Sequence, residues 1–450
     1  MATEAGEAPK IVRRRARSIG FACALVLVFL RFSALPEIIS SMAGVDIYLF
    51  YAFAPVAVFA VIASGRVRRV FRQNAIRFWL LFAVWMILAV PFSTWKGESL
   101  NFVVTYLKTD FVLLVTTVTL TRTWPDCRKM MYAIAAAGVI NMATANLFGT
   151  GGNRLNSKLV GTIGNSNDLA AHLLLVVPFL FFIALKPHTG LLLRLFSTAA
   201  GTLGIFDILR SSSRGALIAL LLTVLFLFVR GSARLKVIVG ACAVVLLVYF
   251  VILLPSATRQ RLMSFSAGAG SSEEAMESSD IREYLLKQSI IDTLQHPLFG
   301  VGPDEFGLYN GTNAPENVTS GAPERYILWR ETHNSYTQIS SECGIPALVF
   351  YLAAGVSTFV LLAKIRKRAT GAFQREIVTA VNCITIGLMS FSIAILFVNF
   401  GYYFQFPVIS GLVVAMWFAV KGKALASSSG DVTFGRPGAA LTQMESLEYS

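Results

Sequence analysis

The sequence predicts an all-α polytopic membrane protein, and three observations support this prediction. Charged residues make up 14% of the 450 residues and hydrophobic residues 55%, whereas soluble domains carry about 25% charged residues. Apolar runs of about 20 residues, long enough to cross the hydrocarbon core of a bilayer, recur along the chain. Lys and Arg gather in alternate connections between these runs. We therefore expect about 12 transmembrane helices, with a large, partly helical periplasmic loop between helices 9 and 10.

Nine of the expected spans precede the large loop, within residues 19–254, and three follow it, within residues 345–420. Each is predicted from its apolar composition and from a length close to the thickness of a membrane. The expected spans are 19–40, 47–64, 76–92, 100–121, 129–148, 166–186, 190–209, 214–230, 234–254, 345–363, 376–399 and 403–420.

The distribution of positive charge predicts the orientation. If the basic N-terminus, residues 1–18, is cytoplasmic, the short inside segments together hold 26 of the 39 Lys and Arg residues. Cytoplasmic connections of membrane proteins are enriched in these residues, so both termini are expected in the cytoplasm. The same bias explains the net charge of +14 without a nucleic-acid partner. The Ser/Gly-rich tail, residues 421–450, is expected to be cytoplasmic and disordered.

The loop at residues 255–344 then lies on the outer side, and it is the longest hydrophilic stretch in which a functional site can be sought. It holds 12 acidic and 6 basic residues, a net charge of −6. A helix is predicted at about 281–295, because Asp280-Ile-Arg-Glu283 resembles a capping box and the apolar residues after it have a helical spacing. A second helix is predicted at about 334–342, where a glycine follows.

A polar segment, GTIGNSNDLA, lies on the outer side just before the sixth span. Asn165, Asn167 and Asp168 in this segment are good helix-capping residues, so one interpretation is simply the start of a helix. The other interpretation is a polar floor that binds a head group or a sugar through Asn165 and Asn167. His172 shares a helical face with Asp168, and a pair between these two side chains is one expectation.

Two arginines, Arg210 and Arg214, flank the outer turn between the seventh and eighth spans, against the inside bias of positive charge. Charges near a bilayer are costly, so they tend to face a partner or a cavity. One interpretation is a salt bridge between either arginine and Asp207. The other is a phosphate site, because guanidinium groups make paired hydrogen bonds to phosphate oxygens and stay charged.

The large loop contributes three further candidates. Arg282 starts the predicted helix, and its simplest interpretation is an exposed cation beside an acidic neighbour. His296 lies in the turn-rich segment HPLFGVGPDEF and is expected to be structural. His333 lies in the segment Thr-His-Asn-Ser-Tyr, where a histidine can position or deprotonate a hydroxyl, although a structural role is equally open. Its neighbours Asn334 and Tyr336 are candidates for substrate binding.

Lys108 and Asp110 lie within the fourth span, where charged residues are functional candidates by default. They are two residues apart, so they do not face each other on a helix and each needs another partner. Lys108 is retained as a substrate-binding candidate, although the pair also favours a transporter. No nucleotide-binding or metal-hydrolase motif is found, and the five scattered cysteines form no CxxC. No metal or other cofactor is therefore expected.

Taken in order, these motifs resemble the O-antigen ligase and O-antigen polymerase superfamily of bacterial envelope enzymes. Each motif is weak alone, but the ordered set, over about residues 160–400, is fairly specific. The first five spans match only as hydrophobic segments. The matching residues are Gly164, Asn165 and Asn167; Ser213, Arg214 and Gly215; Arg282 with Pro297, Leu298, Gly300 and Gly302; His333 to Tyr336; and Glu342 with Gly344.

The resemblance implies an inverting, metal-independent glycosyltransferase at the outer face of the bacterial inner membrane, with residues 255–344 as its periplasmic catalytic loop. Its donor would be a glycan on undecaprenyl pyrophosphate, and in a ligase its acceptor would be a hydroxyl of the lipid A–core oligosaccharide. By position, Arg214 and Arg282 would hold the pyrophosphate and stabilise it as it leaves. His333 would orient or deprotonate the acceptor hydroxyl. Arg210 lies outside the motifs that align and is kept as a substrate-binding candidate.

Two other functions remain open. A polymerase would use a second lipid-linked repeat unit as the acceptor and would build O-antigen or exopolysaccharide. A lipid or solute transporter would transfer no glycan, but transporters often show internal repeats or broken helices, which the sequence does not clearly show. In each case the expected partners include membrane lipids and exclude nucleic acid.

Overall fold

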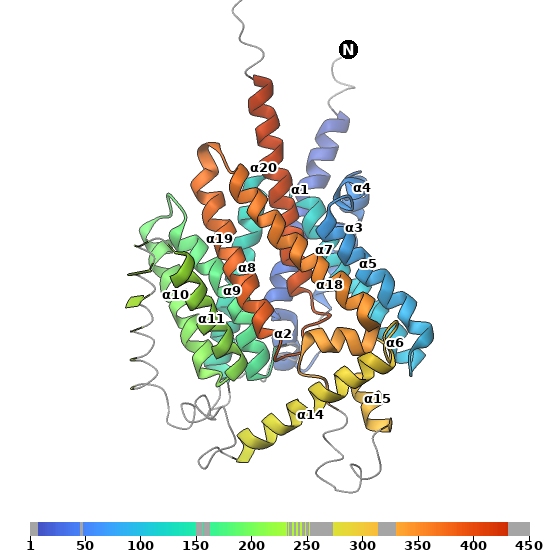
Figure 1. Cartoon of the computed structure of the whole chain (residues 1–450). Helices are drawn as coiled ribbons and strands as arrows, with labels where there is room; N and C mark the ends of the chain where they lie inside the picture. The colour runs from blue at the N-terminus through green and yellow to red at the C-terminus, as the bar shows by residue number, and fades with distance from the viewer. Residues whose placement is uncertain are drawn as a thin grey trace, which may run out of the picture.

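The protein is described by a computed structural model. It covers residues 8–45, 48–149, 155, 163–231, 273–313 and 330–430, with isolated positions between 233 and 252. Within these residues the secondary structure is helical and contains no strand, which confirms the predicted all-α class. The long helices form a bundle, and α14 lies across one of its ends (Figure 1).

The first half of the chain begins with a broken helix. α1 (Ala8–Ser33) and α2 (Leu35–Ala43) are bent by 63°, because Ala34 between them has a left-handed conformation with φ 50°. A single π-helical turn, η2 (Leu107–Phe111), joins α6 to α7. The other elements are α3 (Leu49–Ala63), α4 (Val67–Val70), α5 (Asn74–Ala89), η1 (Val90–Phe92), α6 (Lys96–Tyr106), α7 (Val112–Leu120), α8 (Trp124–Phe148) and α9 (Ser166–Leu185).

The second half contains the helix across the end of the bundle and three long helices after it. The non-helical connection between α19 and α20 is important for the site described below. The elements are α10 (Leu191–Arg210), α11 (Arg214–Arg230), α14 (Glu273–Gln295), α15 (Phe306–Asn313), α18 (Ser335–Arg368), η4 (Gly371–Phe373), α19 (Gln374–Ala394) and α20 (Gln405–Gly430).

Several of these helices are suited to a membrane. In the described part of the chain, seven are long and apolar enough to cross one, or eight if the bent pair α1–α2 is counted as one span. The apolar parts of α3, α11 and α20 are shorter. The expected span 234–254 lies largely outside the described residues, as does the first part of the large loop. A polytopic helical membrane protein is therefore confirmed, while the number of twelve spans stays a prediction.

Helix α9 lies at the centre of the bundle. Nearly all of its side chains are buried, and it packs against α8, α10 and α19. Two glycines allow the close approach: a Cβ at Gly138 would overlap Val176, and one at Gly204 would overlap Val177. Small residues let helix backbones approach in a membrane. The start of α9, which carries Asp168, is therefore held firmly at one end of the bundle.

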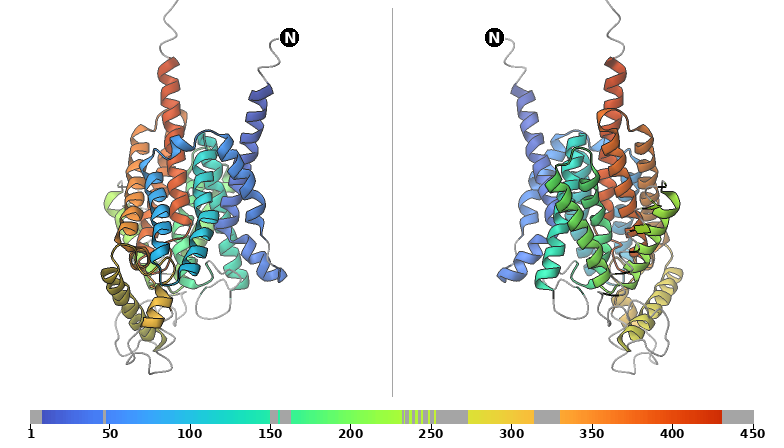
Figure 2. Two further views of the ribbon diagram at one scale, coloured as in Figure 1. Left: turned by 90° about the vertical axis from the view of Figure 1, so that its right-hand side faces the viewer. Right: turned by 90° about the vertical axis from the view of Figure 1, so that its left-hand side faces the viewer.

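The two ends of the bundle differ in character. The start of α1 and the last turns of α20 lie at one end, and α14 lies at the opposite end, here called the α14 end (Figures 1 and 2). The end with the termini is rich in paired cations. Arg128 binds both oxygens of Glu376 at 2.5 and 2.8 Å, and the guanidinium of Arg368 lies 4.9 Å from the ring centre of Trp417. The positive bias seen in the sequence thus includes cations gathered at this end.

The two helices predicted in the large loop are both present. α14 begins at Glu273 rather than at Asp280, so the capping-box-like sequence lies inside the helix and the prediction of its start was wrong. Glu, Ala and Met before Asp280 are strong helix formers and extend the helix backwards. α18 begins at Ser335 and is interrupted at Gly344, with φ 81° and ψ 172°. This interruption confirms the predicted end of the second loop helix.

Candidate functional site

The connection between α19 and α20 holds the start of α18. The backbone N–H of Ser335 donates to the carbonyl of Ile395 at 2.9 Å. Its hydroxyl donates to the carbonyl of Val398 at 2.6 Å and accepts from the N–H of Phe400 at 2.7 Å. Ser335 is fully buried. The serine of the His-Asn-Ser-Tyr segment therefore fixes this segment against the far end of the chain.

The two polar neighbours of His333 have structural contacts. The side-chain oxygen of Asn334 accepts from the N–H of Tyr336 at 3.0 Å and from that of Thr337 at 3.2 Å, which caps α18. The hydroxyl of Tyr336 donates to the carbonyl of Ser392 at 2.8 Å. These contacts explain the residue types without a ligand, so substrate binding by Asn334 or Tyr336 stays a prediction.

His333 lies on a tight turn just before this cap. Its φ of 53° lies in the left-handed region, which is uncommon for a residue with a side chain and indicates a backbone held by its surroundings. The hydroxyl of Thr332 lies 3.0 Å from the side-chain oxygen of Asn399 and 3.0 Å from the carbonyl of Asn334. The amide of Asn399 also donates to the carboxylate of Glu331. Asn399 thus holds the turn that carries His333.

The loop segment after α14 docks on the interruption in α18. The N–H groups of Val301 and Gly302 donate to the carbonyls of Ser341 and Glu342 at 2.8 and 3.0 Å. A Cβ at Gly344 would overlap the carbonyl of Leu298. Only a glycine combines this close approach with a positive φ, so the Pro-Leu-x-Gly-x-Gly and Glu-x-Gly motifs are two halves of one contact.

Aromatic rings hold the same segment on the bundle. The ring of Phe299 stacks on Phe92 at 4.1 Å and on Trp85 at 5.3 Å between centroids. His296 is exposed, and its Nε2 lies 3.1 Å from the hydroxyl of Tyr309. These contacts agree with the prediction that this segment is a packed turn in which His296 is structural.

Two arginines act on the imidazole of His333. Burial, then the charge of Arg282 on α14, then that of Arg330, lower the pKa of His333 to about 4. The imidazole is therefore neutral at physiological pH and can accept a proton. The structure thus brings together two of the three expected catalytic residues, which are distant in the sequence.

Carboxylates and a tyrosine complete this group. Asp168, at the start of α9, is attracted by Arg282 and repelled by Glu331. Burial, and then the charges of Glu331 and Asp168, raise the pKa of Tyr403 in the α19–α20 connection. All of these side chains are at least partly exposed to solvent. We call the group the mouth cluster, and its members are Asp168, Arg282, Arg330, Glu331, His333 and Tyr403.

The polar segment before α9 forms a helix cap. The side-chain oxygen of Asn165 accepts from the N–H groups of Asn167 and Asp168, both at 2.9 Å, and its amide donates to the carboxylate of Asp168. This confirms the helix-start interpretation. The position of Asp168 in the mouth cluster leaves the second interpretation, a polar floor for a ligand, as a prediction for Asn165 and Asn167.

The expected pair between His172 and Asp168 is wrong. His172 is fully buried in the bundle. Its ring nitrogens lie 3.0 Å from the amide nitrogen of Asn141 and 3.4 Å from that of Gln405. A shared helical face is not sufficient for a pair, because the side chain of His172 follows the core packing of α8 and α20 instead.

The two arginines of the α10–α11 turn have different surroundings. Arg210 forms the predicted salt bridge with Asp207 at 3.5 Å and donates to the side-chain oxygen of Asn146 at 2.5 Å. This accounts for its position without a phosphate, so its role in substrate binding stays a prediction.

Arg214 is the first residue of α11 and is partly buried. A Cβ at the next residue, Gly215, would overlap the side chain of Phe397. The Ser-Arg-Gly turn therefore packs on the α19–α20 connection, close in sequence to Val398 and Phe400, which hold the start of α18. This contact places the backbone of Arg214 beside the segment that supports His333.

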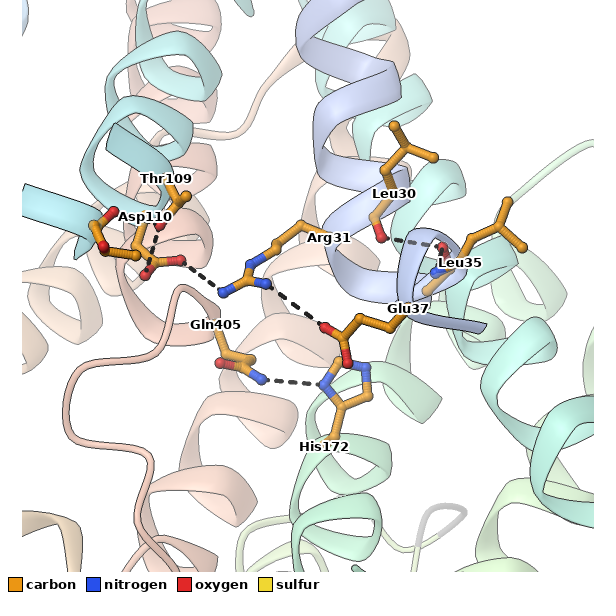
Figure 3. Close-up of polar contacts among 10 residues, drawn as sticks. Leu30, Arg31, Leu35, Glu37, Thr109, Asp110, His172 and Gln405 are labelled. Atoms are coloured by element: carbon orange, nitrogen blue, oxygen red, sulfur yellow. Dashed lines mark hydrogen bonds and ion pairs between the residues drawn. The ribbon is translucent and has the colours of Figure 1, made fainter. Parts of the chain in front are cut away.

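A second polar group lies inside the bundle next to the mouth cluster. The guanidinium of Arg31 lies between the carboxylates of Asp110 at 3.5 Å and Glu37 at 3.8 Å (Figure 3). It also lies 5.0 Å from the ring centre of Phe404, the residue after Tyr403. Asp110 therefore has the separate partner that its spacing from Lys108 required.

Lys108 and Asp110 do face different ways. Lys108 is exposed, whereas Asp110 is buried against Arg31. The π-helical turn that carries both residues is a feature often found at functional sites. Binding of a substrate by Lys108 stays a prediction.

Several residues of the site were missed by the sequence reasoning. Arg31 had a usable signal, because it is a charged residue within an apolar run. Arg330, Glu331 and Tyr403 had none, since their importance comes from contacts between segments distant in the sequence. Among the described residues, no group of three or more His, Cys, Asp or Glu side chains is arranged to hold a metal ion.

The fold and the mouth cluster define a helical membrane protein with a mixed-charge site, built around one neutral histidine, at one end of its bundle. The O-antigen ligase family model matches residues 199–352, from α10 to the middle of α18. Over this range the chain is similar to the O-antigen ligase family, and the match supports the resemblance that its ordered motifs indicated. No curated protein matches it. The matched range contains Arg210, Arg214, Arg282 and His333.

Proposed function

We propose that the protein is an inverting, metal-independent glycosyltransferase that moves a glycan from undecaprenyl pyrophosphate to a hydroxyl of the lipid A–core oligosaccharide. It works in the bacterial inner membrane, with both termini in the cytoplasm and the mouth cluster facing the periplasm. The observation that supports this most strongly is the neutral His333 beside Arg282 and Arg330, in a chain whose residues 199–352 match the O-antigen ligase family model.

The reaction needs one base and a cationic site for the leaving group. The acceptor oxygen attacks the anomeric carbon of the donor sugar, and the bond from that carbon to the pyrophosphate oxygen breaks. The bonding electrons leave with the pyrophosphate, and His333 takes the proton of the hydroxyl. Arg282 and Arg214 stabilise the negative charge that grows on the leaving group. A single displacement inverts the anomeric centre, and the pyrophosphate bond supplies the driving force without a nucleotide.

The direct test is a transfer assay with purified protein, a synthetic polyprenyl-pyrophosphate glycan and candidate acceptors. We expect free polyprenyl pyrophosphate to appear together with the glycosylated product. His333→Ala and Arg282→Ala should each lower the transfer rate by about 10²–10³-fold, the usual effect of removing one group that stabilises a transition state.

The matched control is His296→Ala, which removes an exposed histidine of the same loop. This variant should keep the wild-type rate. Full activity in both His333→Ala and Arg282→Ala would contradict the assignment of the site.

Two other functions are distinguished by the products. A polymerase would give a ladder of repeat units, whereas a ligase gives one transfer to the core acceptor. A transporter is favoured by the bent pair α1–α2 and by the charges of Arg31 and Asp110 inside the bundle, since broken helices and buried charges mark transport pathways. It would move a labelled lipid or solute across a liposome membrane and release no pyrophosphate product.

A further inference from the structure

Glu331 is an exposed acidic side chain that is nevertheless held in place. Its carboxylate accepts a hydrogen bond from the amide of Asn399, and the oxygen of the same Asn399 side chain lies 3.0 Å from the hydroxyl of Thr332. Thr332 is buried. Glu331 is thus fixed on the same turn as His333, two residues away. A carboxylate held in this way loses little conformational freedom when it binds a ligand.

The charged residues near His333 act on different groups. Arg282 and Arg330 act directly on the imidazole. Glu331 acts instead on Asp168 and on Asp304, whose pKa is raised to about 7 by burial and then by Glu331. The site therefore has a cationic group that suits a pyrophosphate and an anionic group that repels one.

Glu331 has the chemistry of a site for hydroxyl groups. A carboxylate only accepts hydrogen bonds, and a sugar hydroxyl can donate one. The charge of Glu331 also acts on Tyr403, whose partly buried ring packs edge-on against Phe400 at 5.0 Å between centroids. A tyrosine offers an apolar face together with a polar tip, which matches the C–H faces and hydroxyl edges of a sugar ring.

We propose that Glu331 binds a hydroxyl of the acceptor beside His333, with Tyr403 against the sugar ring, and that the site therefore selects an uncharged sugar acceptor over an acidic one. This inference rests on the proposed function and adds the chemical class of the acceptor. Asn399 is a positioning residue, because it acts through Glu331 and through the turn of His333.

The test measures binding separately from transfer. The full-length protein in lipid nanodiscs is titrated with dodecyl glucoside, with dodecyl glucuronide and with farnesyl pyrophosphate, which represent a neutral acceptor, an acidic acceptor and the donor head. We expect the wild type to bind the glucoside more tightly than the glucuronide. Glu331→Gln should weaken glucoside binding by about tenfold, the effect of losing one hydrogen bond to a charged group. It should leave farnesyl pyrophosphate binding at least as strong as in the wild type, because it removes a charge that repels a pyrophosphate.

Two further variants sharpen the result. Glu283→Gln removes an exposed carboxylate of α14 that pairs with Lys287 at 2.6 Å, and it should change none of the three affinities. Asn399→Ala releases Glu331 and should weaken glucoside binding in the same direction, but less than Glu331→Gln does.

The proposal is overturned if Glu331→Gln binds the glucoside as the wild type does. It is also overturned if the wild type does not prefer the glucoside, or if farnesyl pyrophosphate binding falls by the same factor as glucoside binding. The expected binding pattern in a protein that transfers no glycan would support the acceptor class and contradict the proposed function, so the two failures are distinguishable.

Discussion

The imidazole of His333 is kept neutral by its surroundings. Its pKa of about 4 lies below the value of about 6.5 for a free histidine, so folding favours the unprotonated form. Stability should therefore fall as the pH drops below about 6.5 towards 4, because the unfolded chain takes up this proton first. In the folded protein the ring is available as a base above about pH 4.

The pH dependence of transfer tests this environment. The acid limb of the pH–rate profile should lie near pH 4 in the wild type rather than near 6.5. Arg330→Gln removes a positive charge that disfavours the protonated ring, so the acid limb should move to higher pH, by up to about one unit. Lys287→Gln, which removes an exposed cation of α14, is the control and should not move it. An acid limb near pH 6.5 in the wild type would contradict the neutral base.

Sequence reasoning identified some of these residues and not others, for physical reasons. His333, Arg282 and Arg214 lie in short ordered motifs with restricted backbone, which a sequence displays directly. Glu331 is held by Asn399 of the α19–α20 connection, and Tyr403 lies in that connection. No local sequence pattern predicts a contact between segments so distant in the chain. His172 shows the opposite error, since the local helical spacing suggested a partner that the core packing does not provide.

The interruption in α18 is the element that joins loop and bundle. Gly344 has a positive φ and faces the carbonyl of Leu298, while Gly300 faces the backbone of Glu342. The sequence predicted a helix end here but not the contact behind it. The start of α14 was predicted incorrectly at Asp280. The capping-box pattern there lies inside a run of strong helix formers, so the helix begins earlier, at Glu273.

A pair of glycine substitutions separates close contact from backbone strain. Gly344→Ala adds a methyl group that overlaps Leu298 and also places Ala at φ 81°. It should lower the free energy of unfolding by more than about 2 kcal/mol and reduce transfer. Gly371→Ala has nearly the same strain, at φ 76°, but no atom within 4 Å of the new methyl group. This control should lose only about 1 kcal/mol and keep full activity.

The stability and the activity of both variants are measured by thermal unfolding in detergent and by the transfer assay. Equal losses in the two variants would argue against a role for the docking contact.

At the scale of the whole molecule, composition and charge predicted a polytopic helical membrane protein but not the shapes of its individual helices. Hydrophobic runs showed a polytopic helical protein, because the bilayer permits few other solutions. They did not reveal the bend between α1 and α2, since it depends on the backbone of Ala34. Both terminal helices reach the end opposite α14, in agreement with the predicted even number of spans (Figure 1).

Cysteine labelling tests the orientation of the molecule. Glu283→Cys on α14 and Lys367→Cys at the other end are both exposed positions. They are introduced into a protein in which Cys242 is replaced by alanine; the other four cysteines are buried. A membrane-impermeant maleimide added to spheroplasts should label Glu283→Cys, and it should label Lys367→Cys only after the membrane is opened. The reverse pattern would place α14 in the cytoplasm and contradict the proposed orientation.

The contact between Ser335 and the connection at residues 395–400 also has a consequence in time. The ribosome makes Arg214, Arg282 and His333 before it makes this connection. Until α19 and its following turn are inserted, these contacts to the turn of His333 are missing, and Asn399 does not yet exist to fix Glu331. If the proposed function holds, a chain truncated before this connection should bind the lipid-linked donor and transfer no glycan. Activity would then begin only after the α19–α20 connection has been made.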